Sequence, residues 1–348
     1  MIVLGIETTC DETSISLVKF ENQKFEIISN VVLSQDIHSI FGGVFPEKAF
    51  RKHQENMVPV LKKALVIDIQ EIDIIGVSAY PGLLGALAAG VATAKTIASL
   101  LDKPVIPVNH LWAHFLVNFI DKEITEVLNK KYLGIVISGG HTSSYLIESL
   151  IPLKITSISR TLDDAVGESF DKVARMLNLG FPGGPIIDKM AQEYKKETNL
   201  NDFKPIFPIP NPSDYSFSYS GLKTAVKRYI EQNKELENSK IKEICYHFQY
   251  SAIKHLIQKI EKIIIDFGIG NVLIGGGVAA NSFLRDELND LKQKYNLEIL
   301  IPPVNLCTDN AVMVAIAAVF LYLSYPNIPN DFDIFPNEDE GNRLWNMS

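Results

Sequence analysis

Two histidines, His110 and His114, are four positions apart in a stretch that follows an apolar segment and has the pattern of a helix. Residues at this spacing project from one face of a helix. Two neutral imidazoles on one face can hold a divalent transition metal, and an oxygen ligand from elsewhere would leave positions open for water or substrate. We expect Asp309, far downstream, to be that ligand. The pair alone leaves a second interpretation open, in which the rings only cap and pack the start of a helix.

A second stretch with reactive side chains, residues 7–13 (ETTCDET), lies between two segments with the pattern of strands. Its backbone amides and side-chain oxygens, among them the carboxylates of Asp11 and Glu12, could contact a phosphate or an amine. A purely structural hairpin turn more often carries Asn-Gly. On this segment alone, a polar turn at the protein surface is the favoured interpretation.

These residues have to be positioned by strands and helices that the sequence also indicates. Apolar segments predict strands at 1–7, 14–20, 25–33, 72–79, 105–108, from 132 to 147 around a small turn, and at 155–159. Helical patterns cover 48–65, the stretch up to 101, 238–267 and 308–325. Two strands continue through glycines into a helix, after residue 79 and after residue 275. Such a turn can bind an anion at the helix start, or its small residues can serve only close packing.

The predicted elements repeat one plan twice. Each half has a strand hairpin, then helices, then a strand, a glycine turn and a helix, and a mainly helical insertion at about 160–235 separates the halves. Two such lobes facing each other would direct both glycine turns into one central cleft, which suits a nucleotide.

Length and composition narrow the class of protein. With 348 residues the chain suits two lobes of about 150 residues each. It has 47% hydrophobic and 21% charged residues, which is typical of a globular protein. The net charge of −8 argues against a protein that binds nucleic acid unaided, so an RNA substrate would need a local basic patch or a helper subunit.

The sequence also indicates where in the cell the protein is expected. Cys10, Cys245 and Cys307 are too far apart for a disulfide framework or a metal knuckle, so we expect the reducing cytoplasm. Acidic residues among the first dozen argue against a signal peptide. We expect the apolar runs at 83–101 and 311–325 to be buried helices rather than membrane spans.

Nine short motifs, in this order, carry a resemblance to a known family. They are ETTCDET (7–13), GGVFPE (42–47), HLWAH (110–114), SGGHT (138–142), DDAVGESFDK (163–172), FPGGP (181–185), FSYSGLK (217–223), GGGVAAN (275–281) and CTDN (307–310). The chain resembles the TsaD family of tRNA N6-adenosine threonylcarbamoyltransferases, once called O-sialoglycoprotein endopeptidases, over nearly its whole length.

The resemblance implies a fold and an activity. The fold would be α/β, the two-lobed actin-like fold of sugar kinases and Hsp70 ATPases, with duplicated βββαβα lobes. One lobe would comprise residues 1–115 with 311–348 and the other residues 116–310. The reaction would move the threonylcarbamoyl group from threonylcarbamoyl-AMP to N6 of adenosine 37, in tRNAs that read codons beginning with A, and would release AMP.

The resemblance also assigns residues. His110, His114 and Asp309 would bind a divalent metal, with iron(II) expected and zinc possible. Asp11, Glu12 and His141 match positions needed for activity. The cleft would hold a nucleotide, threonylcarbamoyl-AMP, with ATP or ADP as alternatives. Contacts with it would come from Val136, Ile137, Ser138, Gly139, Gly140, Asp171, Gly184, Asp188 and Asn281.

The resemblance implies partners and shows departures. Family members work with TsaB- and TsaE-like subunits and with a threonylcarbamoyl-AMP synthase, and no membrane is implied. Trp112 and Ala113 stand where relatives commonly carry an acidic and a small residue, which would change the surroundings of the metal. Tyr80 replaces a commoner Gly and Phe45 a Val.

Three other classes of protein stay open. A metallopeptidase would need HExxH, but Leu111 stands where that motif has its glutamate. A dinucleotide enzyme fits the spacing of Gly275, Gly277 and Ala280, although Glu298 opens the next strand instead of closing it. A small-molecule kinase on the actin-like fold, or an ATP-binding partner without catalysis, is the hardest to separate from the transferase.

Overall fold

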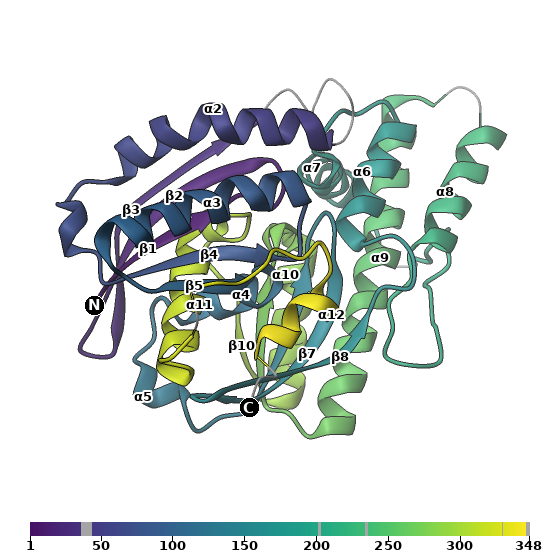
Figure 1. The fold of residues 1–348 in the computed structure, drawn as a ribbon. Coiled ribbons are helices and arrows are strands. Elements are labelled where there is room, and N and C mark those ends of the chain that lie inside the picture. The colour runs from purple at the N-terminus through teal and green to yellow at the C-terminus, as the bar shows by residue number, and fades with distance from the viewer. Residues whose placement is uncertain (36–43, 201–202, 234–235, 329, 346–348) are drawn as a thin grey trace. The chain divides into compact units, whose positions relative to one another are not determined.

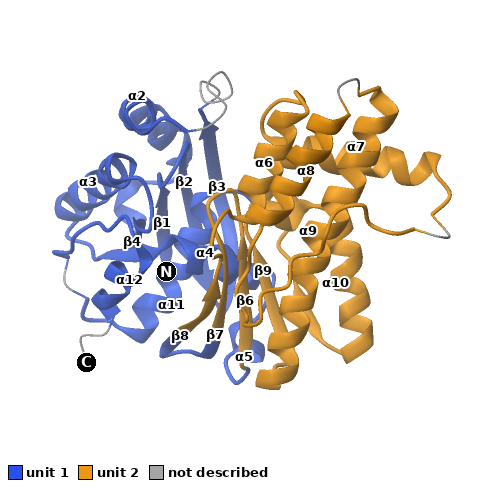
Figure 2. Ribbon diagram, turned by 90° about the vertical axis from the view of Figure 1, so that its right-hand side faces the viewer, with its two compact units in different colours: residues 1–130, 147–155, 308–348 blue, residues 131–146, 156–307 orange. Residues whose placement is uncertain are grey.

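The computed structural model describes residues 1–35, 44–200, 203–233, 236–328 and 330–345 (Figure 1). Contacts along the chain divide it into two compact units (Figure 2). Unit 1 comprises residues 1–130, 147–155 and 308–348, and unit 2 comprises residues 131–146 and 156–307. The lobe boundaries expected at 115/116 and 310/311 stay a prediction, and residues 116–130 group with unit 1 in this division.

Unit 1 contains a five-stranded sheet in the order β3-β2-β1-β4-β5. The strands are β1 (Ile2–Glu7), β2 (Glu12–Glu21), β3 (Lys24–Ser34), β4 (Ile74–Tyr80) and β5 (Val105–Asn109). Strand β2 runs antiparallel to both β1 and β3, whereas β4 is parallel to β1 and β5 is parallel to β4. The central strands β1 and β4 are buried almost throughout and are accordingly apolar along both faces.

Helices cover both faces of this sheet (Figure 1). They are α2 (Pro46–Ala64), α3 (Leu84–Leu101), α4 (His110–Leu116), α5 (Ile124–Val127), α11 (Ala311–Ser324) and α12 (Glu338–Gly341), with short 3₁₀ turns η1 (Ile69–Glu71), η2 (Val117–Phe119) and η5 (Asn342–Trp345). Helix α11 packs on β1, β2 and β4, as expected for a last helix that returns to the first lobe.

Unit 2 repeats the arrangement in a second five-stranded sheet, in the order β10-β9-β6-β7-β8. Its strands are β6 (Tyr132–Ile137), β7 (Thr142–Leu150), β8 (Leu153–Arg160), β9 (Asn271–Gly275) and β10 (Glu298–Leu300). The far ends of β7 and β8 group with unit 1. Here β9 is parallel to β6, and β10 is parallel to β9. Three consecutive strands followed by two parallel strands are therefore found twice, and the predicted duplication is confirmed.

The stretch expected to form a helical insertion, at about 160–235, groups with unit 2. It contains α6 (Val166–Met176), α7 (Gly183–Glu197) and α8 (Ser220–Gln232). Two further helices follow the insertion, the thirty-residue helix α9 (Asn238–Phe267) and helix α10 (Ser282–Tyr295). Unit 2 also contains the 3₁₀ turns η3 (Gly277–Ala280) and η4 (Val304–Leu306). Their apolar faces form one core with β6 and β9. Of the expected connection at 41–47, residues 41–43 lie outside the described part of the chain.

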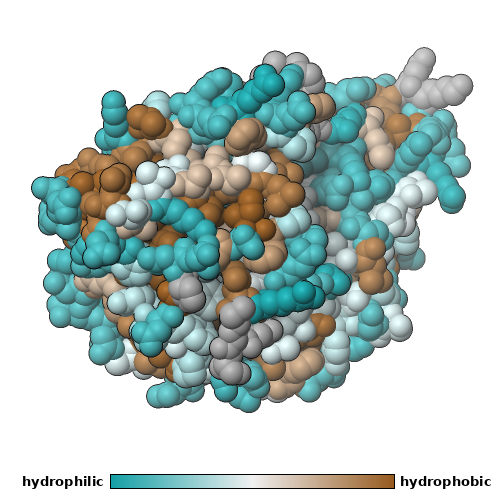
Figure 3. Space-filling model, in the orientation of Figure 1, coloured by the Kyte–Doolittle hydropathy of each residue, from teal (hydrophilic) through white to brown (hydrophobic). Residues whose placement is uncertain are grey.

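The two apolar runs behave differently. Helix α11 is buried from Ala311 to Leu321, as expected. For α3 the expectation of a buried helix is only half right, because 39% of it is buried and Leu84 and Leu100 are exposed. In the described chain α3 alone is long and apolar enough to pass as a membrane span, and it packs on β4 and α2. Apolar surface follows α3 in Figure 3.

Candidate functional site

Polar side chains of unit 1 meet at the carboxyl edge of its parallel strands. Glu7 ends β1, Ser78 lies near the end of β4, and His110 follows β5 directly. Because these three strands run parallel, their carboxyl ends lie at the same edge of the sheet. This register brings residues from three distant parts of the sequence into one buried cluster.

His110, His114 and Asp309 come together as the sequence predicts. One ligand atom from each residue lies within 4.8 Å of the others. Asp309 Oδ1 is 3.2 Å from His114 Nε2 and 3.8 Å from His110 Nε2. Both histidines are buried, whereas Asp309 is partly exposed. Two imidazole nitrogens and one carboxylate form a donor set that suits a divalent transition metal and leaves coordination positions for other ligands.

Glu7 orients the first histidine. Its Oε2 lies 3.0 Å from His110 Nδ1 and accepts a 2.5 Å hydrogen bond from Ser78 Oγ, and its Oε1 accepts one of 2.6 Å from the Thr9 amide. An Nδ1–H donated to a carboxylate leaves Nε2 unprotonated and available for a metal. We had not predicted this role for Glu7. The available signal was a carboxylate at the end of an otherwise apolar strand.

His114 has no equivalent support. Among the described residues, neither of its ring nitrogens makes a hydrogen bond, even though the ring is buried. Trp112 Nε1 is likewise buried without a hydrogen bond, and because an indole N–H only donates, the tryptophan cannot supply the acceptor that an acidic residue could offer. A buried imidazole without a hydrogen bond is costly, and binding a metal through Nε2 would offset that cost. The side chains present therefore fit a metal.

The cluster has an excess of negative charge. Burial, followed by the Asp309 and Asp11 carboxylates, raises the pKa of Glu12 to about 10. Burial would lower the pKa of His110, but Glu7 and Asp309 outweigh it and raise that pKa to about 9. Burial also opposes ionisation of Glu7, yet the His110 charge and hydrogen bond keep the Glu7 pKa below its usual value. A divalent cation would balance these carboxylates and would displace the proton from His110.

The turn that carries Asp11 and Glu12 is packed into unit 1. Thr8 and Thr9 are buried, and the Thr8 hydroxyl donates to the Ala86 carbonyl at 2.8 Å. A Cβ on Gly90 of α3 would lie 2.3 Å from the Thr8 hydroxyl. The surface turn favoured on this segment alone is therefore only partly right, because Thr8 and Thr9 are buried against the rest of unit 1 while Cys10, Asp11 and Glu12 are partly exposed. The small residues after β4 serve this close packing.

Helix α11 presents Asp309. Its N-cap is Asn310, whose Oδ1 accepts from the Met313 amide at 3.2 Å, and the Ala311 amide donates to Ser14 Oγ at 2.9 Å. A Cβ on Gly5 of β1 would lie 2.2 Å from the Ala311 carbonyl oxygen. The helix start rests directly on β1, which fixes the carboxylate two residues before it.

In unit 2 the corresponding turn, between β6 and β7, is open. The Ser138 amide donates to the His141 carbonyl at 2.8 Å, and the His141 amide donates to Ser138 Oγ at 3.1 Å. A Cβ on Gly139 or Gly140 would meet no atom within 4 Å. A Cβ on Gly276, where φ is +96°, would lie 2.4 Å from the Ile137 carbonyl oxygen. The strand ends are thus tightly packed below the turn, while its glycines leave backbone groups accessible. Val136 and Ile137, which precede the turn in β6, are buried.

Asp171 contacts a second glycine pair, Gly183 and Gly184. The Gly183 amide donates to Asp171 Oδ1 at 2.7 Å, and a Cβ on Gly183 would lie 2.5 Å from Ala174 Cβ. A Cβ on Gly184 would meet no atom within 4 Å. Asp171 therefore holds the start of α7 against α6 and leaves the backbone of Gly184 open.

Asp188 and Asn281 are joined through a residue that we had not predicted. Gln249 of α9 donates from Nε2 to Asp188 Oδ1 at 3.1 Å and accepts at Oε1 from Asn281 Nδ2 at 2.8 Å. Asn281 Oδ1 also caps α10 by accepting from the Leu284 amide at 2.9 Å. Gln249 is buried and lies in a helix with an apolar pattern, where a glutamine was the available signal.

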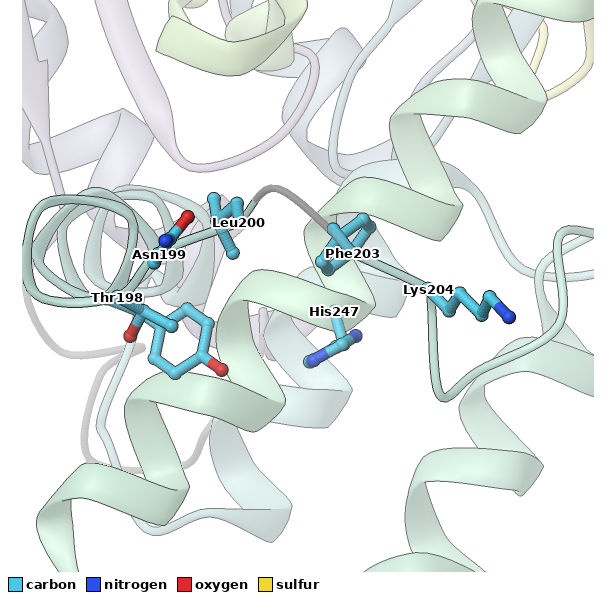
Figure 4. A pocket seen from close by; sticks show the side chains of 7 residues that line it. Thr198, Asn199, Leu200, Phe203, Lys204 and His247 are labelled. Carbon is cyan, nitrogen blue, oxygen red and sulfur yellow. The ribbon is translucent and has the colours of Figure 1, made fainter.

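Two pockets lie in unit 2 away from most of these residues. One has a volume of about 310 Å³ and is lined by Tyr194, Thr198, Asn199, Leu200, Phe203, Lys204 and His247 (Figure 4). The Phe203 and His247 rings stack there at 4.9 Å, and no residue predicted for the site lines it. The other, of about 420 Å³, is lined in part by Gln192, Gln249 and Ser282, which all hydrogen-bond Asp188.

Solved structures support the fold expected from the duplicated plan. Full-length HypF in its phosphate- and nucleotide-bound form aligns with a TM-score of 0.58 and 13% identity, over 94% of this chain and 56% of that one. Component A of (R)-2-hydroxyglutaryl-CoA dehydratase from Acidaminococcus fermentans aligns with a TM-score of 0.51 and 15% identity, over 93% of this chain and 99% of that one. At these identities the likeness concerns the fold alone, which is the actin-like α/β fold.

Sequence relatives are much closer. The tRNA N6-adenosine threonylcarbamoyltransferase of Thermosipho africanus is 42% identical over 97% of this chain and 99% of its own. That of Sulfurihydrogenibium sp. is 47% identical over 90% of this chain and 89% of its own. The family model of TsaD, tRNA N6-adenosine threonylcarbamoyltransferase, matches residues 26–316. With the histidine pair and Asp309 in place at the edge of an actin-like sheet, the chain belongs to the TsaD family.

Proposed function

We propose that the protein transfers the threonylcarbamoyl group from threonylcarbamoyl-AMP to N6 of adenosine 37 in tRNAs that read codons beginning with A. The product is N6-threonylcarbamoyladenosine, and AMP is released. The observation that carries the proposal is the meeting of His110, His114 and Asp309 in a member of the TsaD family.

The reaction needs no nucleophile from the protein. Adenine N6 attacks the carbonyl carbon of the donor, an N–C bond forms, and the bond from that carbon to the phosphate oxygen breaks. AMP leaves with the electron pair, and N6 loses one proton. The proton needs a nearby base, and Asp11 is our candidate because it lies beside Glu12 in the acidic cluster of unit 1. Glu12 and His141 are proposed to support the same step.

The metal proposed for this site is iron(II), with zinc as the alternative. When bound, the metal would supply Lewis acidity towards the donor carbonyl. Glu7 holds His110 in the tautomer that such binding requires, and Asp309 contributes the charge. Both histidines are buried, and the contact with Glu7 orients the His110 ring without any contribution from a substrate.

The nucleotide part of the donor is proposed to bind in unit 2. The open backbone at Gly139, Gly140 and Gly184 suits a phosphate, because amide groups can approach an anion where no side chain intervenes. Asp171, Asp188 and Asn281, with Val136 to Ser138, complete this proposed site. Its place in a central cleft between lobes of residues 1–115 with 311–348 and 116–310 remains part of the proposal.

We also propose partners and a location. The net charge of −8 favours a helper for tRNA binding, and TsaB- and TsaE-like subunits are the candidates. The exposed apolar side of α3, with Leu84 and Leu100, offers a surface for such a protein. A threonylcarbamoyl-AMP synthase would supply the donor, and the reaction would take place in the cytoplasm.

A reconstituted assay tests the proposal. The iron-loaded protein is incubated with unmodified tRNA and threonylcarbamoyl-AMP, with and without TsaB- and TsaE-like subunits, and nucleosides and nucleotides are analysed by mass spectrometry. We expect modified adenosine and AMP in equal amounts. Formation of ADP from ATP with a small-molecule acceptor, without modified tRNA, would instead indicate a kinase. Cleavage of a glycoprotein would indicate the peptidase.

A further inference from the structure

The asparagine before the two histidines contacts the C-terminal part of unit 1. Asn109 is the N-cap of α4, and its Oδ1 accepts hydrogen bonds from the amides of Leu111 at 2.8 Å and Trp112 at 3.3 Å. Its Nδ2 donates to Glu338 Oε1 and to Asn342 Oδ1, each at 3.0 Å. One fully buried amide group thus joins the first turn of α4 to helix α12 and the turn η5.

These contacts fix which way the Asn109 amide faces. An asparagine amide can turn over, exchanging its oxygen and nitrogen, and its hydrogen bonds decide between the two orientations. An ionised Glu338 can only accept, so it requires the nitrogen of Asn109 on its side. The oxygen is then left facing the two α4 amides. The two α4 amides are donors and require the same orientation, so the cap and the strap contacts agree. Without Glu338 and Asn342, the buried Asn109 NH₂ group would lose both of these acceptors, and the capping side chain would no longer be held from this side.

The segment that carries these two residues is firmly attached to unit 1. We call residues 330–345 the C-terminal strap. The Phe335 amide donates to the Ala79 carbonyl at 3.2 Å, and Trp345 Nε1 donates to the Tyr80 hydroxyl at 2.7 Å. A Cβ on Gly341 would lie 2.2 Å from the Tyr80 ring, so the strap backbone rests on that ring. The strap is therefore anchored at the end of β4, next to the strand that leads into α4.

We propose that the C-terminal strap positions the metal-binding helix, with Glu338 and Asn342 acting through Asn109. They are positioning residues and do not reach the metal themselves. His110 lies in the turn that Asn109 caps, so loss of the cap would loosen one ligand while its partner His114 stays further along the helix. This inference rests on the proposed role of His110, His114 and Asp309 as a metal site.

Binding of Co²⁺, followed by its visible absorption, tests the inference in the full chain. The double variant E338A/N342A should raise the Co²⁺ dissociation constant about tenfold. E340A removes the same charge from the same short helix, where Glu340 is exposed, and should bind Co²⁺ like the wild type. E338Q keeps an acceptor oxygen and should lie between the two. Melting temperatures, measured alongside, separate a folding defect from a change in the metal site.

A double-mutant cycle makes the test specific. N109S keeps a capping hydroxyl but cannot span to the strap, so E338A should have no further effect on Co²⁺ binding in that background. An equal effect of E338A in both backgrounds would overturn the inference, as would unchanged affinity in E338A/N342A. H114A should lose Co²⁺ binding. If H114A loses it while the strap variants bind normally, only the strap inference fails, whereas absence of binding by the wild type would overturn both.

Discussion

The first hairpin turn of each unit occupies the same place in the duplicated plan, and the two turns differ in what they expose. After β1, the hydroxyls of Thr8 and Thr9 are buried and the turn is wedged against α3. After β6, Gly139 and Gly140 face open space. One turn holds the carboxylates of Asp11 and Glu12 within electrostatic reach of Asp309, and the other leaves backbone groups accessible. The same topology thus supplies reactive side chains in unit 1 and a surface for an anion in unit 2.

The contacts that hold the candidate site residues in place also differ between the two units. In unit 1 side chains hold side chains, as Glu7 holds His110. In unit 2, beside the side-chain bridge through Gln249, side chains hold backbone groups, as Asp171 holds the Gly183 amide and Asn281 caps α10. Substitutions in unit 1 should therefore change the local charge and the affinity for a metal. Substitutions in unit 2 should change the space and the backbone groups that are available to a ligand.

Loss of the carboxylate ligand should have the largest effect. D309A leaves two imidazoles without their anionic partner, so Co²⁺ binding should weaken by more than the roughly 10–100-fold that is typical of residues that only orient a ligand. Transfer to tRNA should fall in parallel. Titration calorimetry and the transfer assay measure both, with D121A, at an exposed position of the same unit, as the control. Normal Co²⁺ affinity in D309A would remove Asp309 from the metal site.

A methyl group at Gly5 should test how tightly unit 1 is packed. Its Cβ would lie 2.2 Å from the Ala311 carbonyl oxygen, and because that atom belongs to the backbone, α11 would have to shift. We expect G5A to lower the free energy of unfolding by about 3 kcal/mol, and to weaken Co²⁺ binding because Asp309 precedes that helix. Urea unfolding gives the first quantity. G140A, in the open turn, should be as stable as the wild type, and equal losses in both variants would contradict the comparison.

Much of this architecture could be predicted from the sequence, because apolar periodicity and repeated glycine turns report directly on strands, helices and their order. The boundaries of α9 and the pairing of His110 with His114 followed from such local patterns. The role of Glu7, the bridge through Gln249 and the contact of Asn109 with the strap could not, because they depend on sheet register and on side-chain orientation. The exposed side of α3 was missed because its exposed residues are themselves apolar.

A bulky side chain in the open turn should affect ligand binding without affecting stability. The Cβ of G140V enters free space, so the free energy of unfolding should change by less than about 0.5 kcal/mol. The added volume would occupy the region proposed for the donor phosphate, and AMP binding should weaken about tenfold or more. G270V, equally open in the same unit, provides the control. Unchanged AMP affinity in G140V would argue against this turn as the nucleotide site.

The bridge through Gln249 predicts a smaller effect in unit 2. Q249L keeps the size of the side chain but leaves Asp188 and Asn281 without their shared partner. We expect the KM for threonylcarbamoyl-AMP to rise about tenfold with little change in kcat, because the proposed contacts are misoriented before the chemical step. Q258L places the same substitution at an exposed position of α9. If Q249L instead lowered kcat and the free energy of unfolding without changing KM, Gln249 would only pack the core.

A buried histidine in each unit, His110 and His255, allows the effect of charge to be compared. We expect the change in stability due to His255 to be the smallest effect. Glu7 and Asp309 raise the pKa of His110, whereas in unit 2 burial, with Lys259 nearby, lowers the pKa of His255 to about 4. The unfolded chain therefore binds a proton at His255 below about pH 6.5, whereas the folded chain does not. The stability due to this residue is present above that pH and is lost as the pH falls towards 4.

The variant H255Q tests this argument because glutamine does not titrate. In the wild type the Ser218 amide donates to His255 Nε2 at 3.2 Å, and the glutamine side-chain oxygen can accept that hydrogen bond instead. Between pH 7 and pH 5 the wild type should lose about 1–2 kcal/mol more unfolding free energy than H255Q. Parallel losses in the two proteins would show that His255 takes up its proton as readily in the folded unit as in the unfolded chain.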